Sequence, residues 1–491
     1  MTGFGTFTTM PVAGIWREGR AGKTGTDTDP WTGETLTEIA LASAEDLDEA
    51  FRGAAAAQRD WAARPPAQRA GVMLDAARVM EERKKEITGW VVRESGGTLA
   101  KAELEWQLVR AGMMEAASMP HHVTGSIMPS DIPGKESRVY RQPAGVVAVI
   151  SPWNFPLQLS NRSVAPALAC GNAVVLKPSS DTPVTGGLLL ARIFEEAGLP
   201  PGLLSVVAGS GSDIGDAIVS HPVPSVVSFT GSTAVGQGIV KTAGIKRLSL
   251  ELGGNGPLVV LDDADLDAAV DAAVFGSFFH AGQICMIVNR IIADLAVYDE
   301  FVSAFTERVR DLRAGDPADP ATDVGPVINA RQLSSVRDKV DRAVSAGARQ
   351  VVGGEPSGPA GLLLPPHVLL AENGVATAKE EVFGPVITII PAAGEQDALR
   401  IANDTDYGLS SAVFTRDAER GVAFALSVEA GMTHVNDSPV NDDANTAFGG
   451  VKASGIGRFG GQWAIGEFTT EHWVSVQREP RSFPIPSSRR S

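Results

Sequence analysis

One of the chain's two cysteines, Cys285, lies between Ile284 and Met286 in the stretch FFHAGQICMIVNR, residues 278–290. A cysteine thiol can attack an electrophilic carbon as its thiolate. Free cysteine is also among the most buried residue types, and the two apolar neighbours favour simple packing. Taken alone, the stretch favours a core cysteine, and a nucleophilic role depends on what the rest of the chain supplies.

A carboxylate and an amide elsewhere in the chain could complete a catalytic site. Glu251 ends the apolar run LSLE, where desolvation would raise its pKa and suit it to act as a general base near neutral pH. A buried hydrogen-bonding role is the alternative. Asn154, in SPWNFP, lies at a predicted strand-to-helix corner. Its side-chain amide could stabilise an oxyanion or simply cap a helix.

Two segments could bind a phosphate or a ribose. In SVVSFTGSTAVG, Gly231 and Gly236 follow a strand-like run, and free amides at the start of the next helix could hold a phosphate. The spacing matches neither a G-x-G-x-x-G motif nor a Walker loop, so an ordinary strand-to-helix turn is equally compatible. Lys177 ends the run VVLK, where it could bind a ribose or phosphate, or lie solvated on the surface.

The elements that would position these residues form two α/β units. Short β-branched runs alternate with amphipathic runs over 145–244 and again over 256–417, which is typical of doubly wound parallel sheets with helices on both faces. A helical segment precedes them at about 42–110, and a hairpin-like segment rich in proline and glycine lies at about 119–143. A cleft between two such units is a natural binding site.

Composition limits the class of protein. The 491 residues carry a formal net charge of −16, which argues against a nucleic-acid partner. Only Cys170 and Cys285 are present, too few for a disulfide framework or a cysteine-ligated zinc site. The N-terminus lacks a signal-peptide pattern and no apolar run is long enough to span a bilayer. We expect a cytoplasmic protein of two or three packed units, without a metal or a membrane anchor.

The motifs, taken in chain order, resemble those of the aldehyde dehydrogenase superfamily. The motifs are PWNFP (152–156), GNAVVLKPSSDTP (171–183), FTGSTAVG (229–236), LELGG (250–254), GQIC (282–285), EEVFGPV (380–386) and FGGVKASGIGR (448–458). The resemblance implies an α/β fold with two doubly wound parallel-sheet domains and a small β oligomerisation arm. It also implies that Cys285 is the catalytic thiol, Glu251 the base, and Asn154 the oxyanion donor together with the Cys285 backbone amide.

The same resemblance implies that the chain uses NAD or NADP. The residues that it places at the coenzyme are Trp153, Lys177, Ser180, Gly211, Gly215, Phe229, Gly231, Ser232, Gly236, Leu252, Glu381 and Phe383. Family members that prefer NAD often carry a glutamate at the position of Ser180. A serine neither binds the ribose 2′-hydroxyl as strongly nor repels a 2′-phosphate, so the preference stays open and NADP should be tolerated.

Asn255 and His280 stand where lysine and asparagine are common, and these choices resemble the branch that oxidises aromatic aldehydes such as benzaldehyde, vanillin and salicylaldehyde. Ile284 and Met286 would then form an apolar wall for a ring. Arg162, two turns along the predicted helix, could meet a ring hydroxyl or an acidic substituent, or form a structural ion pair. An aliphatic aldehyde or semialdehyde dehydrogenase is the nearest alternative. A non-catalytic binding protein on the same scaffold is another.

The resemblance also sets the expected domain boundaries. Residues 1–120 and 144–253 would form the NAD(P)-binding domain, and 254–452 the catalytic domain. Residues 121–143 and 453–480 would form the oligomerisation arm and the C-terminal return of a homodimer or homotetramer. Residues 481–491 would form a flexible tail.

Overall fold

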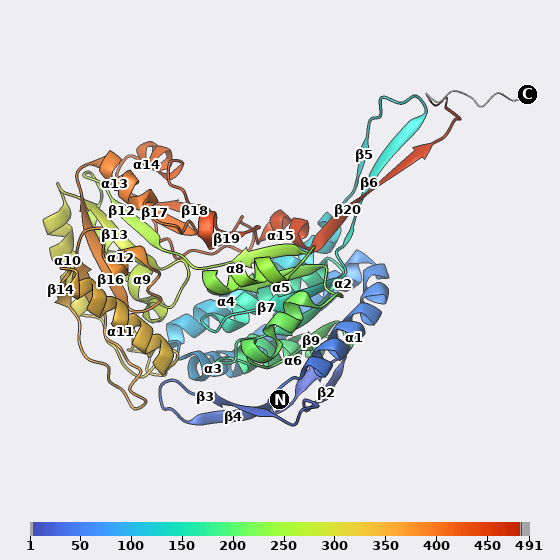
Figure 1. The fold of residues 1–491 in the computed structure, drawn as a ribbon, viewed down its shortest axis with the longest axis horizontal. Helices are drawn as coiled ribbons and strands as arrows, with labels where there is room; N and C mark the ends of the chain where they lie inside the picture. Colours follow the sequence, from blue (N-terminus) through green and yellow to red (C-terminus); the bar gives the residue numbers. More distant parts are fainter. Residues whose placement is uncertain (1–2, 482, 484–491) are drawn as a thin grey trace, which may run out of the picture.

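Figure 1 shows the computed structural model, which describes residues 3–481 and residue 483. Two α/β lobes lie side by side, and a narrow β arm projects from one of them. Residues 482 and 484–491 of the predicted flexible tail lie outside the described residues. The α/β fold with two parallel-sheet units, predicted from the alternation of strands and helices, is confirmed.

The first lobe contains a six-stranded sheet with the order β19-β11-β10-β7-β8-β9. Its neighbouring strands are parallel except for the edge pair β11 and β19. The runs VVAVI and AVVLK become strands because β-branched side chains pack well on a buried pleated surface. The strands are β7 (Val146–Ile150), β8 (Ala173–Lys177), β9 (Leu204–Val206), β10 (Val226–Thr230), β11 (Arg247–Glu251) and β19 (Gly455–Ile456).

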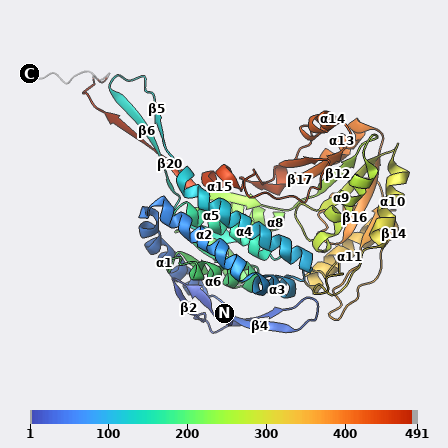
Figure 2. The same cartoon turned by 180° about the vertical axis from the view of Figure 1, so that it is seen from behind.

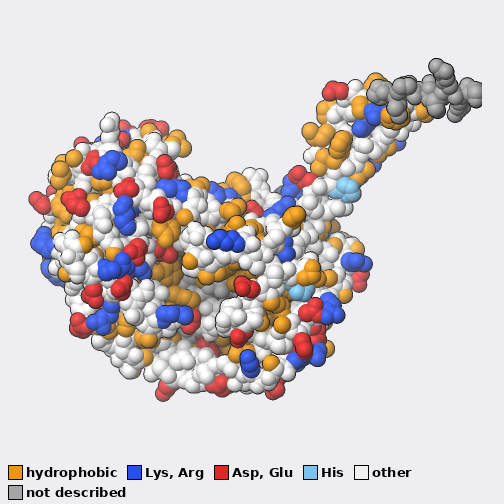
Figure 3. Space-filling view, in the orientation of Figure 1, with side chains coloured by type: hydrophobic (Ala, Val, Ile, Leu, Met, Phe, Trp, Pro, Cys, Tyr) orange, Lys and Arg blue, Asp and Glu red, His pale blue; other side chains and the backbone are white. Residues whose placement is uncertain are grey.

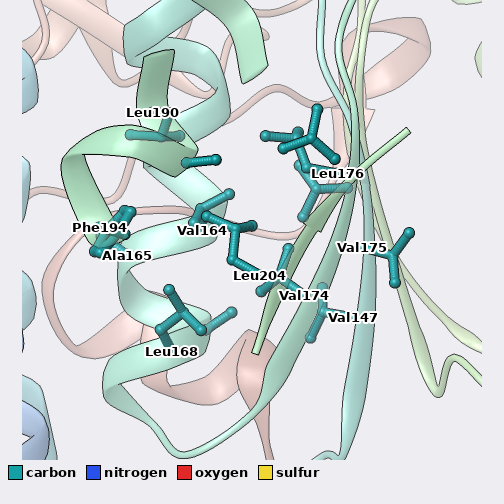
Figure 4. Packing of buried hydrophobic residues seen from close by; sticks show 14 of the residues in the cluster. Val147, Val164, Ala165, Leu168, Val174, Val175, Leu176, Leu190, Phe194 and Leu204 are labelled. Atoms are coloured by element: carbon teal, nitrogen blue, oxygen red, sulfur yellow. The ribbon is translucent and has the colours of Figure 1, made fainter. Parts of the chain in front are cut away.

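Helices cover both faces of this sheet. Helix α8 (Thr233–Thr242) lies in front of the sheet in Figure 1, whereas α2 (Pro66–Glu82) and α4 (Leu99–His122) lie in front of it in Figure 2. Helix α5 (Pro156–Ala169) packs against α4, β7 and β8, and its Leu168 points toward the strands in Figure 4. The other helical segments of this lobe are α1 (Ala44–Ala63), α3 (Lys84–Ser95), η1 (Val184–Leu188), α6 (Leu189–Glu196), η2 (Gly211–Gly215) and α7 (Asp216–Ser220).

The predicted helical segment at 42–110 corresponds to α1, α2, α3 and most of α4. Helix α1 begins with a capping box, in which Ser43 accepts from the Asp46 amide and Asp46 accepts from the Ser43 amide. Two antiparallel hairpins precede it. Their strands are β1 (Met10–Val12), β2 (Ile15–Arg17), β3 (Thr24–Thr28) and β4 (Thr35–Ala40).

The second lobe contains a seven-stranded sheet with the order β14-β15-β16-β13-β12-β17-β18, parallel except for the pair β14 and β15. Leu258 and Val260 pack into one core cluster and Val259 into another, because alternate side chains of a strand point to opposite faces. The strands are β12 (Gly256–Val260), β13 (Val288–Asp294), β14 (Arg349–Val352), β15 (His367–Leu370), β16 (Val386–Ala392), β17 (Ser410–Phe414) and β18 (Met432–Val435). The helical segments are α9 (Leu266–Phe278), η3 (Phe279–Gly282), α10 (Tyr298–Arg310), α11 (Ala330–Ser345), α12 (Ala376–Lys379), α13 (Glu395–Asn403), α14 (Ala418–Ala425) and η4 (Lys452–Ser454).

The arm is a three-stranded antiparallel sheet with the order β20-β6-β5. The hairpin-like segment predicted at 119–143 supplies β5 (Ser126–Met128) and β6 (Lys135–Pro143), and β20 (Thr469–Gln477) joins them after α15 (Gly461–Phe468). Hydrophobic side chains gather on this arm in Figure 3. Ile127 of β5 is 75% exposed.

Candidate active site

Two cavities, each lined by residues of both lobes, meet at Cys285. The larger, of about 230 Å³, lies at the carboxyl ends of β7, β10 and β11, where parallel α/β sheets bind ligands. The smaller cavity has a volume of about 170 Å³. Asn154, Leu159 and Cys285 line both. A thiol in this shared wall can therefore contact ligands in both cavities.

A strained turn after α9 positions Cys285. His280, Ala281 and Gly282 have φ values of 51°, 52° and 70°, three consecutive residues in the left-handed region. A Cβ on Gly282 would lie 2.1 Å from the Gly384 carbonyl oxygen, so only glycine fits there. Such conformations are costly and cluster at functional sites. This turn leaves Cys285 partly exposed, whereas Cys170 is fully buried.

The charges around Cys285 set its protonation state. Burial, assisted by the nearby Glu251 carboxylate, raises the pKa of the Cys285 thiol to about 12, and the Arg162 guanidinium opposes this effect. Cys285 is therefore protonated near neutral pH, and a base must accept its proton before the sulfur can act as a nucleophile.

Glu251, the last residue of β11, has the properties of such a base. It is 1% exposed, and burial raises the pKa of its carboxyl group to about 8, against the effects of Arg162 and Arg458. Neither carboxyl oxygen has a hydrogen-bond partner among the described residues. Glu251 lines neither cavity and lies beside Gly449, where an added Cβ would be 2.9 Å from Glu251 Oε1. The carboxyl group is thus buried, near enough to Cys285 to raise the pKa of its thiol, and without a hydrogen-bond partner among the described residues.

Asn154 presents its side-chain amide at the junction of the cavities. Its Nδ2 donates one hydrogen bond to the Gln283 carbonyl oxygen at 2.9 Å, and the amide group has a second N–H to offer. The start of α5, which follows Asn154, is fixed by Glu105. The Glu105 carboxylate accepts from the Leu157 and Gln158 amides at 2.8 and 3.1 Å, and its own charge is paired with buried Lys101.

The larger cavity contains half of the residues predicted to bind the coenzyme. Those that line it are Trp153, Gly231, Ser232, Leu252, Glu381 and Phe383. The Trp153 and Phe383 rings meet edge to face, with their centres 5.3 Å apart. The Glu381 carboxylate accepts a hydrogen bond from the Gly254 amide at 2.8 Å. A Cβ on Gly231 would lie 2.5 Å from Phe229. Flat apolar walls with one partly buried carboxylate fit a nicotinamide ring and the hydroxyl groups of its ribose.

The other predicted coenzyme residues lie outside this cavity. They are Lys177, Ser180, Gly211, Gly215, Phe229 and Gly236. Lys177 ends β8 and is buried, and burial lowers the pKa of its ammonium group to about 8. Its Nζ donates to the Pro178 carbonyl oxygen at 3.1 Å. Ser180 is exposed, and Gly211 and Gly215 bound the segment η2.

The sequence did not reveal three polar residues of α11 that line the same cavity. Gln332, Ser335 and Lys339 follow each other at spacings of three and four residues, and so share one face of the helix. Gln332 Nε2 donates to the Phe383 carbonyl oxygen at 2.7 Å, and Lys339 Nζ donates to Ser335 Oγ at 2.9 Å. The periodic polar face was a visible signal, but nothing local showed that it faces a cavity rather than solvent.

The smaller cavity is mostly apolar. Its apolar wall consists of Leu104, Leu108, Phe155, Leu159, Phe275, Ile284, Met286, Val440 and Phe448. Ile284 and Met286, which were predicted to line the substrate pocket, both line this cavity. Arg162, the third, also lines the cavity and forms an ion pair with Asp442. Its guanidinium carbon lies 3.8 Å from the centre of the Phe448 ring.

The described residues lack both a metal-binding cluster and a membrane-spanning helix. Within residues 3–481 and 483, no group of three or more histidine, cysteine, aspartate or glutamate side chains could hold a metal ion. None of the helices built from those residues combines the length and apolarity needed to cross a membrane.

Comparison with known proteins identifies the family. Residues 16–474 match the aldehyde dehydrogenase family. The chain is 50% identical to vanillin dehydrogenase of Corynebacterium glutamicum, over 95% of this chain and 97% of that one. It is 48% identical to benzaldehyde dehydrogenase YfmT of Bacillus subtilis, over 96% and 98%. The crystal structure of an NAD-dependent benzaldehyde dehydrogenase from Corynebacterium glutamicum has a TM-score of 0.90 and 47% identity, over 98% and 100%. The chain therefore belongs to the aldehyde dehydrogenase family and is an oxidoreductase that acts on the aldehyde group.

Proposed function

We propose that this protein oxidises aromatic aldehydes to carboxylic acids, with NAD or NADP as the hydride acceptor. The observation that carries the proposal is the position of Cys285 in the common wall of the two cavities. The apolar cavity of about 170 Å³ suits a substituted benzene ring, since roughly 150 Å³ holds benzene. Relatives at 48–50% identity are named for vanillin and benzaldehyde.

In the proposed mechanism, Glu251 accepts the Cys285 proton as the sulfur bonds to the aldehyde carbon. Asn154 Nδ2 and the Cys285 backbone amide donate to the resulting oxyanion. NAD or NADP, which Trp153, Glu381 and Phe383 would hold in the larger cavity, would supply the hydride acceptor, and departure of the hydride from that carbon leaves a thioester on Cys285. Glu251 then releases the thiol proton to solvent. A water molecule attacks the thioester while Glu251 takes a proton from it, the carbon–sulfur bond breaks, and the leaving sulfur takes this second proton from Glu251, so that the acid and the free thiol are released.

Substitution of Asn154 tests the oxyanion assignment. Asn154→Ala removes the N–H that faces the oxyanion, and we expect kcat to fall by about 100- to 1000-fold, as for other oxyanion-hole donors. Coenzyme affinity, measured by calorimetry, should change little. Steady-state rates with benzaldehyde provide the measurement. A kcat within about threefold of the parent would show that the amide does not stabilise the developing charge.

A substrate panel tests the proposed function itself. Benzaldehyde, vanillin and succinic semialdehyde should each be assayed with NAD and with NADP. We expect kcat/KM for the two aromatic aldehydes to exceed that for the semialdehyde by about tenfold or more, because a carboxylate has no free cation in the apolar cavity. The opposite order would favour the semialdehyde dehydrogenase alternative.

We propose that Lys177 and Ser180 meet the adenosine ribose at the end of β8. Ser180 carries no charge that would repel a 2′-phosphate, which supports use of either coenzyme.

We further propose that residues 1–120 and 144–253 form the NAD(P)-binding domain and that residues 254–452 form the catalytic domain. The exposed hydrophobic side chains of the arm, such as Ile127 and Trp473, support a homodimer or homotetramer. We place the enzyme in the cytoplasm.

A further inference from the structure

The smaller cavity has one pair of opposite charges in its wall. Arg162 and Asp442 are the only charged side chains among the described residues that line it. Their side chains are 7% and 9% exposed and form an ion pair. Gln158 Nε2 donates to the same Asp442 oxygen at 3.2 Å. The cavity therefore has a nearly neutral wall, although it contains an arginine.

The pairing changes what Arg162 offers to a substrate. Its Nη2 donates to Asp442, its planar face covers Phe448, and its buried Nη1 has no hydrogen-bond partner in the described part of the chain. An unpaired guanidinium in an apolar wall would attract an anionic substituent strongly, because the surrounding dielectric constant is low. Asp442, held beside it, would repel the same substituent. The net attraction for an anion is thus largely cancelled.

We propose that Asp442 is a specificity-determining residue that neutralises Arg162, so that the cavity accepts uncharged aldehydes and rejects aldehydes that carry a carboxylate. The inference deepens the proposed function and rests on it. Arg162 then serves neither as an anchor for an acidic substituent nor as a direct reactant. It is one half of a charge pair whose other half, Asp442, determines which substrates enter.

Two aldehydes of nearly equal size and shape test the inference: 4-carboxybenzaldehyde, which is anionic, and 4-formylbenzamide, which is neutral. We expect the parent enzyme to favour the amide in kcat/KM by about 100-fold or more, since an unpartnered carboxylate is costly to desolvate. Asp442→Asn should shrink this preference by about tenfold or more, because Arg162 would then face the carboxylate without a competing anion. The ratio cancels any general effect on Cys285 or Glu251.

The double variant Arg162→Met/Asp442→Leu is the matched control. It replaces the buried pair with apolar side chains, a change that buried ion pairs often tolerate. It should still discriminate against the anion, because no cation remains. If it gains activity on 4-carboxybenzaldehyde as Asp442→Asn does, Arg162 is not the cause and the inference is wrong. A parent enzyme that oxidises the anion within about threefold of the amide would also overturn it, even if Asp442→Asn fails to fold.

Oxidation of benzaldehyde distinguishes a failure of the proposed function from a failure of the Asp442 assignment alone. If the parent enzyme does not oxidise benzaldehyde, the proposed function itself fails. If it does, but Asp442→Asn leaves the ratio between the anionic and neutral substrates unchanged, only the assignment of Asp442 fails.

Discussion

Cys285→Ala is expected to lower kcat for benzaldehyde oxidation by about four to six orders of magnitude, the scale seen when other enzymes lose their nucleophile. The aldehyde carbon does not readily release a hydride until it becomes tetrahedral, and in the proposed mechanism Cys285 supplies the attacking sulfur. The larger cavity loses only the thiol of one lining residue, so coenzyme affinity should stay within about threefold of the parent. The absorbance of the reduced coenzyme measures kcat, and calorimetry measures the coenzyme affinity.

Cys170→Ala is the matched control, because Cys170 is the other cysteine of the chain and lies fully buried between α5 and β8. It should keep most of the parent's activity. Substantial oxidation by purified Cys285→Ala would overturn the nucleophile assignment.

Alkylation followed by peptide mass mapping gives an independent test of Cys285. Iodoacetamide should modify partly exposed Cys285 first, and more rapidly as pH rises toward the raised pKa of its thiol.

Local patterns predicted the fold, because the alternation of strands and helices depends on short segments, whereas the catalytic roles of Cys285, Glu251 and Asn154 were implied by the family resemblance and stay predictions. Alternating β-branched and amphipathic runs predicted both sheets, and the corner at Asn154 was visible from the residues around it. The two interpretations of Cys285 could not be separated locally. Its apolar neighbours Ile284 and Met286 are buried, as a core cysteine would require, yet they also line the smaller cavity.

Features that depend on long-range contacts could not be predicted. Arg162 and Asp442 are 280 residues apart, so the sequence could not decide between a substrate contact and an ion pair. The structure favours the pair. The polar face of α11 meets the larger cavity only because the second lobe packs beside the first. The position of the Glu251 carboxyl group beside Gly449 likewise depends on a contact between segments that are far apart in the sequence.

Glu251→Gln is expected to slow thioester hydrolysis by about 100- to 10,000-fold, the usual contribution of a general base. The amide keeps the shape of the side chain but cannot accept a proton from water. If acylation still occurs through the small thiolate fraction, mixing enzyme, coenzyme and benzaldehyde should produce reduced coenzyme in an initial burst, followed by slow turnover. Mass spectrometry of the intact protein should then show an added benzoyl group on Cys285.

The pH dependence of thioester hydrolysis gives a second test of Glu251 as the general base. Burial raises the pKa of Glu251 to about 8, so the carboxylate, the form that acts as a base, is in the minority at pH 7 and predominates above pH 8. The hydrolysis rate of the parent should therefore rise with pH through about 8. In Glu251→Gln this titration should be lost, leaving a slower hydrolysis whose rate rises in proportion to the hydroxide concentration and does not level off above pH 8.

Glu467→Gln is the control for Glu251→Gln, because Glu467 is a half-buried carboxyl group whose pKa is also raised by burial but which lines neither cavity at Cys285. It should accumulate no benzoyl-enzyme. If Glu251→Gln also accumulates none and its hydrolysis rate still levels off above pH 8, another group activates the water. If neither thioester formation nor thioester hydrolysis slows in Glu251→Gln, Glu251 accepts no proton during catalysis, and its buried carboxyl group has only a structural role.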